Sequence, residues 1–325
     1  QFAPGTDNLG SNYNKLLNCN LECPANSTSS YHVPLVASTI GSISGYANNA
    51  NYTLVQDCNL VSGYYSARWN GTSSTATNTN VGNEFISNDF VDWYYYGPYF
   101  YYVGSGLKIK NNNIVQRKTG TFTTTGGYAL YGYYLNDGPE ISYNYIWSAY
   151  ASMYVFYINN ATVSTSNRGK VFNNMCISNG TSTTYGLYVG YPRYTDVAYN
   201  SVYTKTTGTS YGFYNYGDNS TLYSLKAVNN YVVHEGNGAW YALYNYYSAA
   251  YTQFDYNAWH RIGTGTDYYW WNYGVNSVSY ASLAALQAAV TGFHQNSKYG
   301  NAFYISNTDL HSRSHVGYQA GTPVT

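Results

Sequence analysis

The stretch ISYNYI, residues 141–146, carries the pattern apolar-x-x-Asn-x-apolar, and this pattern returns along the chain. Its other copies are FISNDF (85–90), IKNNNI (109–114), VFNNMC (171–176), VAYNSV (197–202), AVNNYV (227–232) and FDYNAW (254–259). The asparagines of these copies are Asn88, Asn112, Asn144, Asn174, Asn200, Asn230 and Asn257. They lie between 24 residues (Asn88 to Asn112) and 32 residues (Asn112 to Asn144) apart. A period of this length is typical of solenoid repeats.

A tyrosine-rich phrase lies between consecutive copies of this pattern, for example YGLYVGY (185–191) and YGFYNYG (211–217). We align these phrases on an apolar residue that is followed by an aromatic one. The alignment predicts an aromatic strip of Tyr101, Tyr131, Tyr157, Tyr188, Tyr214, Tyr244 and Trp271. We interpret the strip as a ladder of stacked rings that holds the fold together. The alternative is a surface that binds sugar rings or a partner.

Together the two phrases predict an all-β fold, a parallel β-helix solenoid of about nine or ten coils in which equivalent positions stack into columns. Positions three before and two after each Asn are apolar throughout, as inward columns require. We expect Asn to adopt the left-handed conformation at a corner and to bond to the Asn one coil away. A right-handed path follows from the strong preference of parallel crossovers.

One domain with three parts is expected. Residues 1–50 would form an N-terminal arm and cap, with only LLNCNL (16–21) resembling a coil. Residues 51–274 would form the coils, and residues 275–325 a C-terminal cap. In that cap Ser279 or Ser282 can begin a short helix that runs to about Val290, and Gly292 can end it.

A charge column lies four positions before each Asn and tests the register. It contains Glu84, Lys108, Glu140, Lys170, Asp196 and Lys226, and the sign alternates at every step. Like charges on stacked coils would repel, so the alternation favours this register. We expect Lys170 to lie within ion-pair distance of Glu140 and Asp196.

The chain resembles secreted bacterial right-handed parallel β-helix repeat proteins, especially large surface proteins that are exported by type IX secretion. The residues that carry the resemblance are the Asn-x-apolar and YG-[LF]-Y phrases and the ending, with FDYNAW (254–259), SYASLAALQAAV (279–290) and AFYISNTDLH (302–311). The resemblance covers roughly residues 50–325 and implies the fold rather than an activity.

Composition bounds the partners. The chain has 325 residues, 45 of them tyrosine, and its formal net charge is zero. A neutral surface argues against binding nucleic acid. No run of 18 apolar residues occurs, so no membrane span is predicted. The low charge and abundant Asn, Ser, Thr and Tyr favour a secreted, extracellular protein, and a start at Gln1 suits a processed one.

Cysteines and sequons give two further predictions. Cys19 and Cys58 occupy the Asn slot of their repeats, so we predict a disulfide between them, or failing that between Cys58 and Cys23. Cys176 lies in an inward column and is predicted to be a buried free thiol. Glycosylation sequons begin at Asn26, Asn51, Asn70, Asn160, Asn179 and Asn219, although a chain this rich in Asn, Ser and Thr also forms sequons by chance.

No constellation in the sequence marks a catalytic, cofactor or metal site. The acids are spread thinly, and the six histidines are scattered. We therefore predict a non-enzymatic structural or adhesive protein that assembles head to tail into a surface filament through its Gln1–Asn14 arm. The alternative is a carbohydrate-binding or polysaccharide-degrading β-helix protein.

Overall fold

The structure is a computed structural model. It describes residues 11–25, 27–38, 42–45, 50–72, 80–116, 127–149, 153–159, 167–217, 224–246, 251–273, 276–301 and 304–311. Statements about the fold refer to these residues.

The strands form three sheets that run the length of the molecule. The first sheet contains β1 (Lys15–Leu17), β4 (Leu54–Gln56), β7 (Glu84–Ile86), β10 (Lys108–Lys110), β13 (Glu140–Ser142), β16 (Gly169–Phe172), β19 (Thr195–Ala198), β22 (Leu225–Val228) and β25 (Tyr251–Asp255). The second sheet contains β2 (Asn20–Glu22), β5 (Asn59–Val61), β8 (Asp89–Val91), β11 (Asn113–Gln116), β14 (Tyr145–Ser148), β17 (Met175–Ser178), β20 (Ser201–Lys205), β23 (Tyr231–Glu235), β26 (Ala258–Ile262) and β29 (Lys298–Tyr299). The third sheet contains β3 (Val36–Ala37), β6 (Tyr65–Asn70), β9 (Tyr96–Val103), β12 (Gly127–Leu135), β15 (Met153–Asn159), β18 (Thr184–Gly190), β21 (Ser210–Tyr216), β24 (Trp240–Asn245), β27 (Asp267–Tyr273) and β28 (Asn276–Tyr280).

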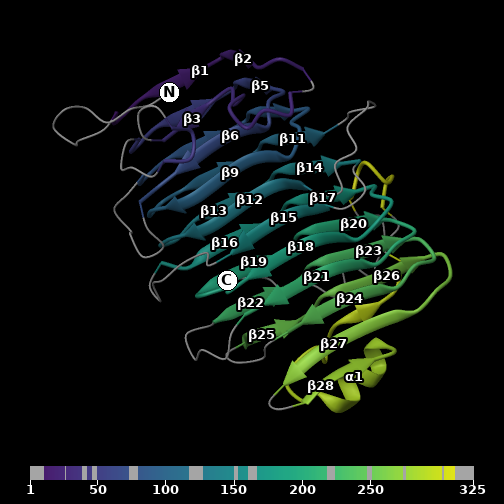
Figure 1. Ribbon diagram of the computed structural model, residues 1–325. Helices are drawn as coiled ribbons and strands as arrows, with labels where there is room; N and C mark the ends of the chain where they lie inside the picture. The colour runs from purple at the N-terminus through teal and green to yellow at the C-terminus, as the bar shows by residue number, and fades with distance from the viewer. Residues whose placement is uncertain are drawn as a thin grey trace.

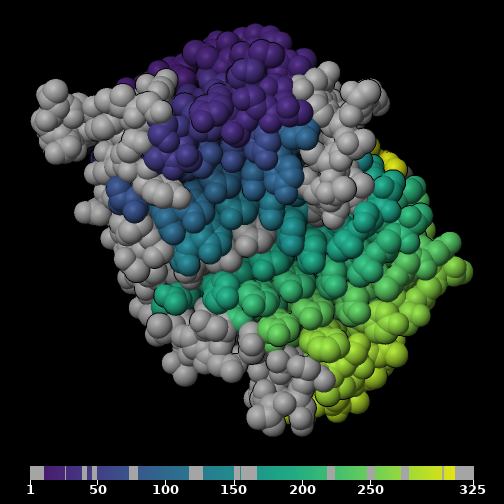
Figure 2. Space-filling model, in the orientation of Figure 1, coloured from purple at the N-terminus to yellow at the C-terminus, as the bar shows by residue number. Residues whose placement is uncertain are grey.

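The chain visits the three sheets in turn, so that one strand of each makes one coil, and nine such triplets follow one another from β1 to β27. Every pairing between successive coils is parallel, and only β28 pairs antiparallel, with β27. Figure 1 shows the coils stacked from the purple N-terminal end to the α1 end, and Figure 2 shows them as successive bands of one body. The predicted parallel β-solenoid fold is confirmed.

The core is the stack of inward columns. Side chains three positions before each Asn are fully buried, from Val55 to Phe254, and so are those two positions after it, from Leu60 to Trp259. Removing this apolar surface from water is the main driving force for stacking one coil on the next.

The Asn pattern contains a corner, and the prediction for its conformation was wrong in one respect. The left-handed residue is the one before each Asn: φ is 58° at Tyr143, 54° at Asn173 and 56° at Tyr199. This bend splits the pattern into a first-sheet strand and a second-sheet strand. The Asn pattern and the tyrosine phrase together predict two strands in each coil, whereas the structure has three, one in each sheet.

The two ends of the solenoid differ. Strands β1 and β2 begin it at Lys15, within the segment assigned to the arm, and no described strand lies beyond them. At the other end β28 pairs with β27, and α1 (Leu283–Ala289) buries Leu283 and Leu286 against the core. The backbone N–H of His294 donates to the carbonyl of Phe254 at 2.8 Å, which covers part of the last first-sheet strand.

Replacing Ser282 should weaken this cap. The Ser282 side chain accepts a hydrogen bond from the backbone N–H of Ala285 at 3.1 Å, so Ser282 is the N-cap of α1. We expect Ser282→Ala to lower the free energy of unfolding of the cap by about 1 kcal/mol. Hydrogen exchange of the α1 amides measures the effect. The matched control is Ser279→Ala, because Ser279 lies in β28 and is exposed. Equal effects of the two substitutions would contradict the assignment.

Candidate functional site

The seven predicted asparagines form one buried ladder. From Asn112 to Asn257, each side-chain oxygen accepts from both the backbone N–H and the side-chain amide of the Asn in the preceding coil. For Asn174 these bonds come from Asn144 at 3.1 and 2.9 Å. The Asn174 amide in turn donates to the Ile141 carbonyl and to the Asn200 oxygen, both at 2.9 Å. All four hydrogen-bonding positions of the side chain are thus used inside the core.

The ladder continues into other residue types at its ends. At the C-terminal end the Asn257 N–H donates to the Ser297 hydroxyl at 3.2 Å. At the N-terminal end the Cys58 N–H donates to the Asn88 oxygen, and the Cys19 N–H donates to the Cys58 Sγ at 3.4 Å. Sulfur therefore takes the acceptor role of the Asn oxygen.

The predicted disulfide is absent from the structure. Cys19, Cys23, Cys58 and Cys176 are all free thiols. Cys58 does occupy the Asn slot next to Cys19, but its sulfur serves as a hydrogen-bonding rung of the ladder. Cys176 is fully buried, as its inward column requires, and burial raises the pKa of its thiol.

The charge column has the predicted register but not all of the predicted partners. Glu84, Lys108, Glu140, Lys170, Asp196 and Lys226 pair in sequence across the first sheet. Lys108 reaches Glu84 at 2.7 Å. Glu140 instead pairs with Lys110 at 3.8 Å, and Asp196 pairs with Arg168 at 2.7 Å.

The expected ion pairs of Lys170 with Glu140 and Asp196 were wrong, since neither occurs in the structure. Arg168 explains one of them, because its guanidinium bonds Asp196 through two nitrogens and also reaches the Ser224 carbonyl at 2.8 Å. The planar guanidinium of Arg168 loses less side-chain entropy per hydrogen bond than the flexible Lys170 would, so Asp196 pairs with Arg168.

The outer face of the third sheet carries tyrosines in columns, and we call it the tyrosine face. Its first column contains Tyr65, Tyr96, Tyr128, Tyr154, Tyr185, Tyr211, Tyr241 and Tyr268. Neighbouring rings in it are stacked with centroids 4.2 to 5.1 Å apart. A run of offset-stacked rings stabilises each coil against the next.

The second column corresponds to the predicted strip, with different ends. It contains Tyr99, Tyr131, Tyr157, Tyr188, Tyr214, Tyr244 and Trp270. Ring centroids in it are 4.6 Å apart for Tyr99 and Tyr131 and 4.7 Å for Tyr214 and Tyr244. The side chain of Tyr157 lies outside the described residues.

Two predicted members of the strip were therefore wrong. Tyr101 pairs with Tyr133 in a third column, because Pro98 takes the place of the Leu or Phe of the phrase. At the other end the register shifts between Tyr241 and Leu243, which turns Trp270 outward and leaves Trp271 buried in the core.

The tyrosine face is aromatic, and its phenol groups are uncharged. Burial raises the pKa of the Tyr96, Tyr185 and Tyr214 phenols above its ordinary value, so the rings stay protonated at physiological pH. The Arg68 guanidinium lies at the N-terminal end of the face. Its carbon is 4.7 Å from the centroid of Tyr65, in the first column, and 5.2 Å from that of Tyr99, in the second. Away from Arg68, these phenol groups can pack against another surface without bringing charges together.

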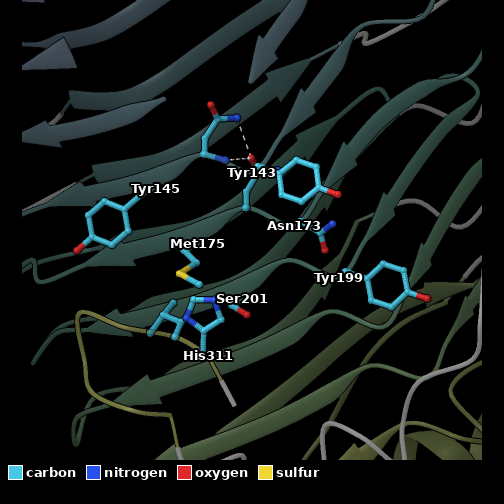
Figure 3. Close-up of a pocket in the computed structure, with 10 residues that line it drawn as sticks. Tyr143, Tyr145, Asn173, Met175, Tyr199, Ser201 and His311 are labelled. Carbon is cyan, nitrogen blue, oxygen red and sulfur yellow. Dashed lines mark hydrogen bonds between the residues drawn. The ribbon is translucent and has the colours of Figure 1, made fainter. Parts of the chain in front are cut away.

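A groove lies at the corner between the first and second sheets, and Figure 3 shows it. One wall is formed by the left-handed corner residues Tyr143, Asn173 and Tyr199, and the other by the strand-starting residues Tyr145, Met175 and Ser201. Leu310 and His311 of the C-terminal segment complete it. The volume of this corner groove is about 570 Å³.

The corner groove was missed by the sequence reasoning, although the sequence carries a signal for it. The residue before each ladder Asn alternates between amide and aromatic over six coils, as Asn111, Tyr143, Asn173, Tyr199, Asn229 and Tyr256. The contribution of His311 carries no such signal. His311 reaches the groove because the C-terminal segment returns along the second sheet. There the centroids of the Tyr304 and Tyr231 rings lie 4.8 Å apart.

The sequons divide into three groups. Asn51 and Asn70 are buried, and their amides donate to Asn12 and to the Ile43 carbonyl. A glycan on either is incompatible with this packing, so these two predictions were wrong. Asn179 is half-buried. Asn26, Asn160 and Asn219 lie outside the described residues.

Comparison of the chain with family models, with curated proteins and with solved structures finds no match. The function has to be argued from the surfaces alone. In the part of the chain that the structure describes, no three His, Cys, Asp or Glu side chains are grouped to hold a metal ion. No described helix is long and apolar enough to cross a membrane. A β-solenoid with a tyrosine-rich surface fits a structural or binding protein.

Proposed function

We propose that this protein is a non-enzymatic, extracellular structural or adhesive protein that assembles head to tail through the open N-terminal end of its solenoid. The observation that carries the proposal is the difference between the two ends. Among the described residues nothing covers the outer edges of β1 and β2, whereas β28 and α1 cover the C-terminal end.

The first coil has the properties of an interface. Leu16 and Leu21 occupy inward positions yet are only half-buried, because no described coil lies above them. Unpaired strand edges next to exposed apolar side chains template further pairing. A contact between two different ends does not close on itself, so it produces an open polymer. Zero net charge removes the repulsion that would oppose it.

The structure narrows the part of the arm that can reach a neighbour. Tyr13 stacks on Tyr52 at 5.0 Å, and the Asn14 carbonyl accepts from the Leu54 N–H at 2.9 Å. This part of the arm packs on its own second coil, contrary to the expectation for Gln1–Asn14. Only residues 1–10, which lie outside the described residues, remain for a neighbouring subunit.

Three carboxylates of the first sheet are consistent with a non-enzymatic role. Glu84, Glu140 and Asp196 are each paired with a cation along the first sheet. Glycoside hydrolysis needs two carboxyl groups free to act on one bond. The predicted surface location of the protein is part of the same proposal.

Deleting residues 1–10 should leave a folded monomer that no longer polymerises, as measured by light scattering and electron microscopy. Leu16→Lys should have the same effect, because it places a charge at the open end while its stem still covers the core. The matched control is Ile305→Lys, because Ile305 is an exposed apolar side chain on the C-terminal segment, away from the first coil. A full-length protein that stays monomeric at high concentration would contradict the proposal.

A further inference from the structure

We propose that the corner groove is a binding site for an extended, neutral, β-linked polysaccharide chain that runs along the solenoid axis. This site is separate from the open N-terminal end that the proposed assembly uses. The inference rests on the aromatic and amide side chains of the groove and on their spacing.

The aromatic rings of the groove are more exposed than those of the tyrosine face. Tyrosines on the tyrosine face cover one another, but the exposed fraction is 50% for Tyr143 and 38% for Tyr199. Tyr143 is held in place by the edge of the Phe172 ring, with centroids 5.4 Å apart, and by the Lys110 Nζ, 5.7 Å from its centroid. An open aromatic ring that is held in position can take the C–H face of a pyranose at little entropic cost.

The spacing suits an extended chain. Tyr143 and Tyr199 sit at equivalent corners two coils apart, which places them about 10 Å from each other. An extended β-linked chain presents the same ring face at every second sugar, at a similar interval. Figure 3 shows Asn173 between the two tyrosines, where the intervening sugar would lie.

Polar groups for hydroxyl recognition lie beside the rings. The Asn173 side chain forms no hydrogen bond with the described residues, so its amide can both donate and accept. The Asp309 carboxylate accepts a hydrogen bond from the His311 Nδ1 at 2.5 Å, which fixes the ring and leaves Nε2 for a ligand. Aromatic walls with a few placed polar groups are typical of small-ligand sites.

A neutral ligand matches the charges around the groove. Lys110, whose Nζ lies 5.7 Å from the Tyr143 ring centroid, is already paired with Glu140, and the Asp309 carboxylate is hydrogen-bonded to His311. No cationic cluster for sulfated or phosphorylated chains lies among the lining residues. The inference therefore selects neutral sugars over acidic ones.

Isothermal titration of the full chain with soluble hexasaccharides tests the inference. The probes are β-1,4-linked glucose and β-1,4-linked N-acetylglucosamine, with the coiled α-1,4-linked glucose hexasaccharide as comparison. We expect at least one β-linked probe to bind and the α-linked probe to bind at least ten-fold more weakly. Absence of β-linked binding at millimolar concentration, or equal binding of the α-linked probe, would overturn the inference.

Variants of the corner residues locate the site. Tyr143→Asn and Tyr199→Asn use the residue that the same column already carries in the left-handed conformation at Asn111 and Asn173, so the fold should be kept. Each should lower affinity about ten-fold, whereas Tyr143→Phe should retain binding. The matched control is Tyr52→Asn, at a corner with φ of 52° and the same 50% exposure but outside the groove. Equal losses in Tyr52→Asn and Tyr143→Asn would place binding elsewhere.

Discussion

Asn174→Ala is expected to destabilise the solenoid by about 4 kcal/mol, which is more than a typical point substitution costs. The change removes the side-chain oxygen that accepts two hydrogen bonds from Asn144. It also removes the side-chain amide that donates to the Ile141 carbonyl and to the Asn200 oxygen. Each buried polar group that loses its partner costs about 1–3 kcal/mol, and Asn174 is almost fully buried. Denaturant unfolding measures the total loss.

The coils in which Asn174→Ala weakens hydrogen-exchange protection distinguish a hydrogen-bonded ladder from ordinary packing. Because each coil contacts only its neighbours, hydrogen exchange should rise first in the coils that contain Asn144, Asn174 and Asn200. The control is Asn113→Ala: among the described residues the Asn113 side chain donates one exposed hydrogen bond, to Asp89 at 2.8 Å, and its loss should cost less than about 1 kcal/mol. A similar loss in both variants would show that the ladder has no special role.

Column positions could be predicted from the sequence because one residue type repeats in each. The inward columns and the Asn ladder follow from period alone, since a buried position accepts only apolar or fully bonded side chains. The register of the tyrosine column could be predicted only where the phrase is regular. Pro98 in place of Leu leaves the pairing regular but moves the apolar–aromatic pair that the alignment uses to Phe100 and Tyr101. The bulge next to Tyr241 shifts the pairing itself, and the sequence carries no sign of it.

Side-chain partners were harder to predict than columns. The alternation of Glu140, Lys170 and Asp196 fixes which strands pair, but a long side chain chooses its partner by local geometry. Asp196 therefore forms its ion pair with Arg168, although Arg168 lies outside the column. The cysteines show the same limit: Cys58 occupies an Asn slot as expected, but its sulfur accepts a hydrogen bond from Cys19 instead of bonding covalently.

Lowering the pH from 7 to 4 is expected to destabilise the C-terminal cap by about 3 kcal/mol through His294 alone. Both ring nitrogens of His294 are buried without a hydrogen-bond partner among the described residues, between Phe254 and Trp271. Burial lowers its pKa from 6.5 to about 3. The unfolded state therefore binds a proton below pH 6.5 that the folded state excludes, so stability is complete above pH 6.5 and falls until about pH 3.

His294→Asn tests this dependence, because Asn tolerates the φ of 60° at this position and does not titrate. The variant loses ring packing at pH 7, so the informative quantity is the difference in unfolding free energy between pH 7 and pH 4. We expect this difference to shrink by about 3 kcal/mol relative to the parent chain. A smaller acid dependence should remain, since burial also lowers the pKa of His234, to about 4.

His311→Asn serves as the control for replacing a histidine, since the His311 side chain is largely exposed whereas that of His294 is fully buried. If His294→Asn retains the acid loss of the parent chain, the buried imidazole is not its source. In the parent chain, hydrogen exchange at pH 4 should rise first in α1 and β28, because His294 connects the cap to β25 through the Phe254 carbonyl. Acid would then expose the second end of the solenoid, and mild acid should alter the proposed head-to-tail contact before it unfolds the coils.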